Sequence, residues 1–420
     1  MPGVRDDGGQ RGASALICSS MDLRTGITGS TGEERCAQRR TRVEKELVID
    51  LCALVPQKGS IGSADEKNCE QMLGHVPIPV GYAGPLSVTF SSGETSEIHL
   101  PLATTEGALV ASVNRGCKAL NLSAANGSGQ GVTTSSIHHG MSRSIALRIQ
   151  KTEDQRPKKA EEIKTHEVQW RHAAEATSDH LKILRYELDE MADHLFLTIF
   201  CDTDEAMGMN MVTIAAQAVG EWIAENIEGV EFVTVAGNVD SDKKPSSRVH
   251  EHGRGYEVTA EAVLSAEVIT DVLKTTPEAL MSVARAKLEL GSAIAGAIGK
   301  NLHAANIIAA LYLATGQDAA HVVEGSLTDT RINELANQRV HISVRLPAVL
   351  VGVRGGGTTL PAQSQCLKML MKPKTSLHPK AQLAESIGAA VLAGEISLLA
   401  AQASHSLATA HGKLGRVTVK

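Results

Sequence analysis

Hydrophobic positions in this chain recur at two spacings, and the change between them predicts where helices and strands lie. Apolar residues three and four apart have the period of a helix face. This pattern predicts helices over residues 33–48, 103–120, 205–226, 278–299, 303–316 and 379–416. Shorter runs rich in Val, Ile and Phe predict strands, over residues 195–203 and 230–238 and as a strand pair over 341–360.

The remaining segments lack either period. Residues 1–32 are rich in Gly, Ser, Thr and Arg, which predicts a disordered leader. Residues 75–86 contain three prolines and cannot form a helix, so an extended segment is expected. Residues 151–195 are densely charged and are predicted to be a solvated helical segment.

Composition narrows the class of protein. A hydrophobic content of 42% and a charged content of 21% are typical of a globular protein. Aromatic residues make up only 2%, which argues against a single-strand nucleic-acid binder, since such a binder stacks bases on aromatic rings. The net charge of −6 provides no general attraction to nucleic acid or to an anionic membrane. Neither is expected as a partner.

The cysteines and the apolar runs indicate the cellular compartment in which the protein is expected. The seven cysteines are scattered and form no Cys-x-x-Cys pair, so neither a disulfide framework nor a metal site is expected. The most apolar run, residues 387–403, is interrupted by Glu395, and residues 1–32 contain no apolar signal segment. The expected location is cytoplasmic.

Several short stretches suit the binding of anions. Asn114 and Arg115 in "NRG" offer an amide and a guanidinium, which suit phosphate. Gly208 near a predicted helix start permits close approach of a phosphate or dinucleotide. The "RGGGT" stretch at 354–358 is a second flexible, amide-rich turn. Because no strand is followed by Gly-x-Gly-x-x-Gly, an ordinary Rossmann site is not expected.

Charged side chains in three other stretches suggest chemistry. In "DSDKKP", the adjacent Lys243 and Lys244 precede a rigid proline. Asp318 follows an apolar helix, where the helix dipole disfavours an anion, so a partner cation is needed and Lys243 is a candidate. Glu106 in "TTEG", with Thr104 as N-cap, is predicted in the first turn of a helix. A carboxylate there can have a purely structural role, because it complements the positive end of the helix dipole. His411, near the end of the last helix, is by itself most often a structural residue.

Taken in order, the stretches "VPIPVGYAGPL", "ATTEGALVASVNRGC", "AMGMNMV", "DKKP", "HAANI", "ATGQDAA" and "GGGT" resemble one family over about residues 66–416. That family is the 3-hydroxy-3-methylglutaryl-CoA (HMG-CoA) reductases, in their soluble catalytic part, and the biosynthetic class more than the degradative one. The resemblance implies reduction of a thioester to an alcohol by two hydride transfers from NADPH, or from NADH, without a metal. The products are mevalonate, a precursor of isoprenoids, and free CoA.

The resemblance also implies an α+β fold and its assembly. A helical N-terminal domain is expected over residues 33–69. A large helix-centred domain that binds substrate and CoA is expected over 70–143 and 241–420, with a small ferredoxin-like NADP(H)-binding domain inserted at 144–240. The family pattern further implies a homodimer or higher homo-oligomer whose active sites lie at the subunit interface.

Catalytic roles follow by motif from the same resemblance. Lys243 matches the cation that stabilises negative charge on the carbonyl oxygen, and Glu106 the acid that protonates it. Asp318 matches the carboxylate that links these two, and His411 the acid that protonates the departing thiolate. Predicted substrate contacts come from Ser112, Asn114, Arg115, Arg143, Lys244, Lys287 and Asn306. Predicted cofactor contacts come from Ser178, Asp179, Glu205, Met207, Gly208, Met209, Asn210, Gly355, Gly356, Gly357 and Arg416.

The chain departs from the family pattern at several positions. Ala236 replaces a serine, Glu205 replaces an aspartate, and one residue is missing before His303. Asp179 replaces an arginine that helps hold the 2′-phosphate of NADPH, while Arg416 is retained. Three alternatives remain beside an HMG-CoA reductase. They are the same fold using NADH or running oxidatively, a CoA-binding or regulatory protein without turnover, and a helical scaffold without a ligand.

Overall fold

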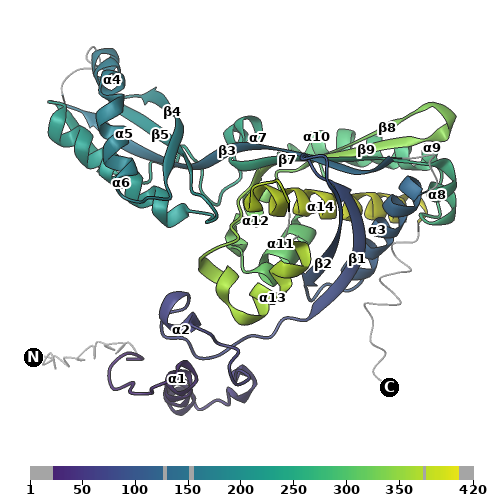
Figure 1. The fold of residues 1–420 in the computed structure, drawn as a ribbon, viewed down its shortest axis with the longest axis horizontal. Coiled ribbons are helices and arrows are strands. Elements are labelled where there is room, and N and C mark those ends of the chain that lie inside the picture. The colour runs from purple at the N-terminus through teal and green to yellow at the C-terminus, as the bar shows by residue number, and fades with distance from the viewer. Residues whose placement is uncertain (1–21, 126–129, 151–155, 372–374, 406–420) are drawn as a thin grey trace, which may run out of the picture. The chain divides into compact units, whose positions relative to one another are not determined.

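The computed structural model describes residues 22–125, 130–150, 156–371 and 375–405 (Figure 1). The predicted site residues His411 and Arg416 lie outside the described residues, as do residues 1–21. The chain separates into two compact units, Met1–Val76 and Pro77–Lys420.

The first unit is built on one capped helix. Its elements are α1 (Gly32–Leu47), η1 (Cys52–Leu54) and α2 (Ala64–Lys67). Thr31 and Glu34 form a capping box at the start of α1, which satisfies backbone donors at that end. Arg35 of α1 donates to Asp65 of α2 at 2.7 Å, and Arg42 donates to the carbonyl oxygen of Thr25 at 2.6 Å. These bonds tie α2 and the turns of residues 22–31 to α1.

The second unit contains a nine-stranded mixed sheet. Its strands are β1 (Val80–Thr89), β2 (Thr95–Ala103), β3 (Gln130–Ile149), β4 (Lys182–Met191), β5 (His194–Asp202), β6 (Val230–Thr234), β7 (Gly255–Leu264), β8 (Asp329–Glu334) and β9 (Val340–Val349). The main path runs β2-β1-β3-β7-β9-β8, with β5 and β6 paired to β3 and β4 paired to β5. Only the β1–β3 pair is parallel among these described strands.

The 20-residue strand β3 belongs to two groups of strands (Figure 1). Its pairing with β7 ends at Gly140, and its pairing with β5 begins at Met141. Gly140 has φ +86°, a backbone conformation that other residues adopt only with strain. The change of partner at this glycine therefore lets one strand serve two hydrophobic cores. One core surrounds α14, and the other surrounds β5 and α6.

Helices cover both groups of strands. They are α3 (Leu109–Ala125), α4 (Arg156–Thr165), α5 (Glu167–Glu175), α6 (Met209–Asn226), α7 (Ser247–His252), α8 (Ala266–Asp271), α9 (Pro277–Ala284), the π-helix η3 (Arg285–Gly291), α10 (Ser292–Ala295), α11 (Ala304–Thr315), η4 (Ala319–His321), α12 (Val322–Gly325), η5 (Ala336–Gln338), η6 (Gly356–Thr359), α13 (Pro361–Leu370) and α14 (Pro379–Ala403). The prediction of a mixed α and β protein is confirmed.

Helix α14 forms the centre of the larger core. Its length and composition would allow a membrane span, but 94% of its most apolar window is buried inside the protein. A Cβ on Gly116 would lie 1.9 Å from the carbonyl oxygen of Ala393, so glycine permits the close packing of α3 on α14. The buried Glu385 accepts hydrogen bonds from Ser91 and Thr134, and its cost of burial is thereby reduced.

Two helices begin several residues later than the sequence predicts. The helix predicted from residue 103 begins at Leu109, because residue 103 completes strand β2 and Ala108 adopts a positive φ of 71°. The helix predicted from residue 205 begins at Met209, because Gly208 takes a left-handed conformation and caps it. In both places a turn with a positive φ interrupts an apolar run that has helical spacing.

Two assignments of secondary structure were also incomplete. Residues 151–195 were predicted as helical, yet β4 follows α4 and α5 within this range. Its charged side chains are partly exposed because β4 has a strand partner on one side only, β5. The pair predicted within 341–360 is one strand, β9, whose partner β8 lies earlier in the chain. Six cysteines are free, and Cys18 lies outside the described residues.

Candidate active site

The lysine pair lies on a loop with several left-handed residues. Asn238, Ser241 and Lys243 have φ values of +65°, +50° and +58°. The backbone N–H of Lys243 donates to Oε1 of Glu324 at 2.6 Å, and Nζ of Lys244 donates to the carbonyl oxygen of Asp242 at 2.8 Å. Non-glycine residues with positive φ are strained, so the bond to Glu324 from outside the loop and the bond to Asp242 within it help to hold this conformation.

The Lys243 ammonium forms an ion pair with Asp318. Its Nζ lies 2.8 Å from Oδ2 of Asp318, and both side chains are about one-third exposed. Oδ1 of Asp318 accepts the N–H of Ala320 at 3.0 Å. Burial alone would raise the pKa of Asp318, but the hydrogen bonds from Lys243 and Ala320 outweigh it and hold that pKa below its usual value. Asp318 is therefore an anion beside the ammonium.

The position of Asp318 corrects the expectation based on the helix dipole. Helix α11 ends at Thr315, and the chain turns at Gly316, which has φ +73°. Asp318 is the N-cap of the short helix η4. An N-cap carboxylate satisfies free N–H groups, so its location favours the anion rather than opposing it.

A buried guanidinium lies beneath the lysine loop. Arg254 is 1% exposed and donates to Oδ1 of Asp242 at 3.1 Å and to Oε1 of Glu324 at 3.0 Å. It also donates to Oγ of Ser142 at 3.0 Å and to Sδ of Met209 at 3.3 Å. Arg254 thus joins the lysine loop, α12, β3 and the first residue of α6 in one network.

A second arginine, Arg143, approaches Asp242 and also Asp240, whose Oδ2 lies 3.6 Å from Arg254. Its NH1 lies 3.4 Å from Oδ2 of Asp240 and 3.6 Å from Oδ2 of Asp242. Burial raises the pKa of Asp240, although Arg254 and Arg143 oppose the rise. For the less buried Asp242, burial also raises the pKa, but the charge and hydrogen bond of Arg254 prevail and lower it. The two aspartates are therefore electrostatically different.

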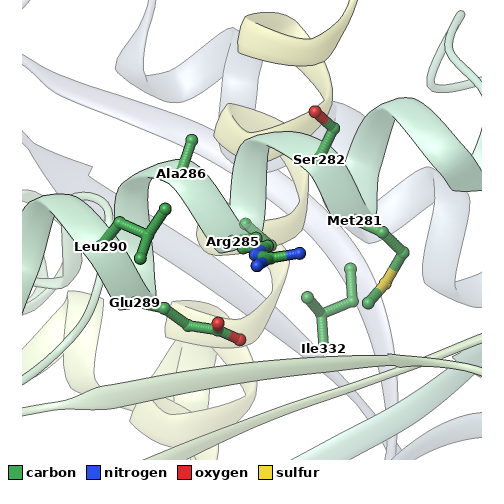
Figure 2. Close-up of a pocket in the computed structure, with 8 residues that line it drawn as sticks. Met281, Ser282, Arg285, Ala286, Glu289, Leu290 and Ile332 are labelled. Carbon is green, nitrogen blue, oxygen red and sulfur yellow. The ribbon is translucent and has the colours of Figure 1, made fainter.

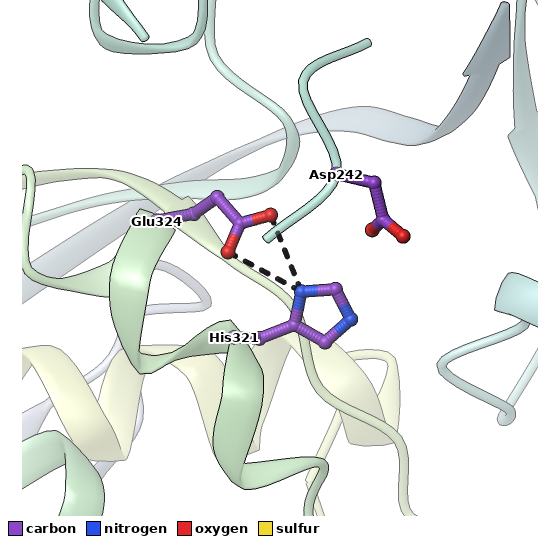
Figure 3. Close-up of side chains that lie close together, drawn as sticks. All are labelled: Asp242, His321 and Glu324. Carbon is purple, nitrogen blue, oxygen red and sulfur yellow. Dashed lines mark hydrogen bonds and ion pairs between the residues drawn. The ribbon is translucent and has the colours of Figure 1, made fainter. Parts of the chain in front are cut away.

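Asp242, His321 and Glu324 form a cluster with the donor atoms of a metal site (Figure 3). Nδ1 of His321 lies 3.3 Å and 3.4 Å from the two carboxylate oxygens of Glu324. The Arg254 guanidinium contacts both carboxylates of this cluster, so a side chain supplies the cation that they need. His321 also extends the cluster toward the ion pair, because its Nε2 lies 3.7 Å from Oδ2 of Asp318.

Sequence reasoning missed three residues of this network. They are Arg254, His321 and Glu324. Asp318, His321 and Glu324 recur every three residues, a spacing that places side chains on one side of successive helical turns. That spacing was a usable signal. Nothing in the local sequence connects Arg254 with residues 70 positions away, so this contact required the tertiary structure.

Glu106 lies in the turn between β2 and α3, and its side chain is exposed. Its N–H donates to Oγ1 of Thr104 at 3.0 Å, so Thr104 caps this turn and not the helix that begins at Leu109. Among the ion pairs of the described residues, that of Lys243 is with Asp318 and not with Glu106. Of the three predicted catalytic residues that the structure describes, the chain therefore brings two together, Lys243 and Asp318.

The predicted CoA contacts on α3 bond to other parts of the protein. Oγ of Ser112 donates to Oγ of Ser397 at 3.0 Å, and Arg115 donates to the same oxygen at 3.0 Å. Oδ1 of Asn114 accepts the N–H of Gly84 at 3.0 Å. Of the other predicted substrate residues, Lys287 lies on the π-helix η3 and Asn306 near the start of α11.

The predicted cofactor residues that the structure describes gather where α6 begins. A Cβ on Gly208 would lie 2.3 Å from the side chain of Thr203, so only glycine fits here. The carbonyl oxygen of Glu205 accepts the N–H of Val353 at 2.9 Å, and its carboxylate lies 3.0 Å from Nε of Arg354. These bonds bring the triple-glycine turn, residues 355–357, beside the N-terminal end of α6.

The turn with Asp179 adjoins the same place. Asp179 is exposed, and Oγ of Ser178 accepts the N–H of His180 at 3.2 Å. Nδ1 of His180 lies 3.0 Å from Oδ2 of Asp204, which belongs to the turn that precedes α6. Met207, Met209 and Asn210 complete this region, with Met209 buried. Free N–H groups at the start of a long helix suit a phosphate.

A separate cavity of about 620 Å³ opens between the π-helix region and β8 (Figure 2). It is lined by Met281, Ser282, Ala284, Arg285, Ala286, Glu289, Leu290 and Ile332. This set contains none of the predicted site residues. The cavity is therefore distinct from the lysine loop and contributes nothing to the geometry described above.

Comparison with known proteins identifies close relatives. The family model for hydroxymethylglutaryl-coenzyme A reductase matches residues 35–416. The 3-hydroxy-3-methylglutaryl-coenzyme A reductase of Methanocaldococcus jannaschii is 40% identical over 385 residues, covering 90% of this chain and 92% of that protein. The protein of the same name from Haloferax volcanii is 40% identical over 391 residues, with 90% and 92% covered.

The fold has a counterpart among solved structures. The class II 3-hydroxy-3-methylglutaryl-CoA reductase of Streptococcus pneumoniae, bound to NADPH in open conformations, superposes with a TM-score of 0.64. The match covers 90% of this chain and 99% of the other, at 19% sequence identity. The two proteins therefore share a fold.

Proposed function

This chain belongs to the hydroxymethylglutaryl-coenzyme A reductase family and is an oxidoreductase, and from that premise we propose that it reduces HMG-CoA to mevalonate and free CoA in a pathway to isoprenoids. The observation that carries the proposal is the Lys243–Asp318 ion pair, held on a loop that the buried Arg254 network supports. A nicotinamide dinucleotide supplies the hydride in each of the two reductive steps.

The proposed chemistry requires a fixed cation. Each step places negative charge on a carbonyl oxygen, and an ammonium already in position stabilises that charge without reorganisation. Lys243 is assigned this role, and Asp318 orients it. Glu106 is assigned the proton that the oxygen receives, and His411 the proton that the CoA thiolate receives. The Glu106 and His411 assignments rest on their motifs.

The substrate residues are assigned in the same way. Lys244 lies on the lysine loop and Arg143 contacts Asp240 and Asp242 of that loop, and both cations suit the free carboxylate of the hydroxymethylglutaryl group. Lys287 and Asn306 are assigned to the same group, and Ser112, Asn114 and Arg115 to the CoA side. The hydrogen bonds from Ser112 and Arg115 to Ser397 imply that these side chains exchange partners when CoA binds.

The dinucleotide is assigned to the N-terminal end of α6. Gly208 removes a side chain there, the exposed turn at residues 355–357 adds backbone N–H groups, and the helix dipole favours a phosphate. The proposed domain organisation supports this assignment: a small domain over residues 144–240, inserted into the large one, would carry α6 on its own hydrophobic core. No metal is part of the proposal, and the proposed location is the cytoplasm.

One assay tests the proposed function directly. HMG-CoA-dependent oxidation of NADPH and of NADH is followed side by side, with mevalonate and free thiol measured as products. We expect two dinucleotides oxidised for each mevalonate formed. Binding of CoA and dinucleotide without any turnover would instead support a regulatory protein, and absence of all binding by calorimetry would support a scaffold.

Cofactor choice is predicted to depend on Asp179. Its exposed carboxylate suits a ribose 2′-hydroxyl and repels a 2′-phosphate. We expect Asp179→Arg to raise the NADPH-to-NADH ratio of kcat/KM at least about tenfold. The matched control is Asp271→Arg, which makes the same charge change at an exposed residue at the end of α8. An unchanged ratio in Asp179→Arg would remove this residue from cofactor choice.

A second prediction concerns the assembly. Because Glu106 is exposed and is not ion-paired with Lys243 within the chain, we propose that the site is completed between subunits of a homo-oligomer. Mixing inactive Glu106→Gln and Lys243→Ala subunits under exchange conditions should then restore part of the activity. Each variant mixed with itself provides the baseline. A fully active monomer in light scattering would refute shared sites.

A further inference from the structure

Lys380 occupies an unfavourable place for a cation. It belongs to the first turn of α14 and is only 3% exposed. Helix N-termini have partial positive charge, and burial of an ammonium is costly unless it is well paired. Burial lowers the pKa of Lys380 to about 8, although Asp202 and Asp204 oppose this shift. Because the helix N-terminus and burial both disfavour an ammonium here, Lys380 is a candidate for a role beyond packing.

The ammonium of Lys380 holds the turn that precedes α6. Its Nζ donates to Oγ1 of Thr203 at 3.1 Å and to the carbonyl oxygen of Ala206 at 3.2 Å. Oγ1 of Thr203 donates to the same carbonyl oxygen at 2.8 Å. Gly208 lies two residues after Ala206, and a Cβ on it would lie 2.3 Å from the Thr203 side chain. Lys380 and Thr203 thus determine the shape of the turn from which the first N–H groups of α6 project.

The charged and titratable groups around Lys380 come from several elements. Oδ1 of Asp202, at the end of β5, lies 3.8 Å from Nζ of Lys380. His378 is the N-cap of α14, and its Nε2 lies 3.8 Å from Oδ1 of Asp204. His138 of β3 stacks on Tyr256 of β7, and burial and then the charge of Lys380 lower its pKa. The groups to consider in any pH effect are Asp202, Asp204, His138, His139, Tyr256 and His378.

We propose that Lys380 is a positioning residue for the dinucleotide: its ammonium fixes the turn of residues 203–208 so that the N–H groups at the start of α6 converge on a phosphate. The proposal rests on the proposed function, because it assigns the dinucleotide to this end of α6. Lys380 acts through the turn and not by contact with the reacting atoms. Its loss should therefore weaken dinucleotide binding and spare HMG-CoA binding.

The main test compares Lys380→Met with Lys380→Arg. We expect Lys380→Met to raise KM for the dinucleotide about tenfold, with kcat and KM for HMG-CoA within about twofold of the unmodified protein. Lys380→Arg keeps the charge and should recover much of the loss. The thermal midpoint of Lys380→Met should not fall, because the change removes the desolvation cost of the ammonium and its carboxylate partner, Asp202, is 41% exposed and 3.8 Å away. Lys164→Met, at an exposed ion pair on α4, is the control.

Two further measurements keep the proposal testable if Lys380→Met does not fold. Thr203→Val removes the hydroxyl that accepts from Lys380 and should raise the dinucleotide KM, whereas Thr203→Ser should not. In the unmodified protein, KM for the dinucleotide should rise as the pH passes about 8, where the ammonium loses its proton. Lys380→Arg should lack this rise, because a guanidinium stays charged at that pH.

Direct binding separates this proposal from the proposed function. The Kd for NADPH, and for NADH, is measured by titrating nicotinamide fluorescence without HMG-CoA. If the protein shows no HMG-CoA-dependent turnover, the proposed function fails, yet a weaker Kd in Lys380→Met would still support the positioning role. An unchanged Kd in Lys380→Met, or equal losses for both substrates with a lower thermal midpoint, would overturn it.

Discussion

Replacing Lys243 by alanine is expected to lower the turnover of HMG-CoA at least about 10²–10³-fold, the size of losing one donor to a developing oxyanion. The rate of the aldehyde half-reaction should fall as well, because both reductive steps place negative charge on a carbonyl oxygen. Both rates are measured with purified Lys243→Ala protein, supplied with HMG-CoA or with the aldehyde intermediate.

The neighbouring lysine provides a control for this experiment. The Lys244 ammonium donates to a backbone carbonyl and not to Asp318. Lys244→Ala should therefore act mainly through KM for HMG-CoA, with a smaller change in kcat. If Lys243→Ala retained near-normal turnover, Lys243 would have no part in the chemistry and the Lys243–Asp318 pair would be structural.

Replacing Arg254 by methionine is expected to lower the free energy of unfolding by about 3–5 kcal/mol, because it leaves buried carboxylates without their cation. Glu324 has no other arginine partner among the described ion pairs, whereas Asp240 and Asp242 share this guanidinium with Arg143. Since Glu324 also accepts the N–H of Lys243, the lysine loop should lose its support and activity should fall. Denaturant unfolding and HMG-CoA turnover measure the two effects.

A double variant tests whether the instability of Arg254→Met comes from the unpaired charge of Glu324. Adding Glu324→Gln to Arg254→Met removes one unpaired buried charge but keeps an oxygen that accepts from Lys243. The double variant should recover part of the lost stability, and Arg254→Lys should lie between Arg254→Met and the unmodified protein. A loss below about 1 kcal/mol in Arg254→Met would contradict the proposed network.

The local sequence predicted those helices and strands whose hydrophobic pattern and residue types are recognisable over a few neighbouring positions. The apolar runs of β5, β6 and α11 were predicted within a few residues, because period and β-branched content are properties of neighbouring positions. The motifs that contain Gly208, Lys243 and Asp318 were recognised for a related reason: their residue types and order are written in the chain.

Tertiary structure decided the environment of those residues. Strand β4 was read as helix because charged side chains on a partly exposed strand have no apolar alternation of their own. The N-cap role of Asp318 depends on a turn at Gly316 that the preceding helical period does not reveal. The network of Arg254 joins residues from β3, the lysine loop and α12.

The sequence alone therefore determined the family and which side chains are present at the site. The fold alone determined which of them meet, which are buried and which charges are matched. The physical reason is range: propensity and periodicity act over a few residues, whereas the burial and pairing of a charge depend on residues brought together by packing. Lys380, more than 170 positions from the turn it holds, is the clearest case.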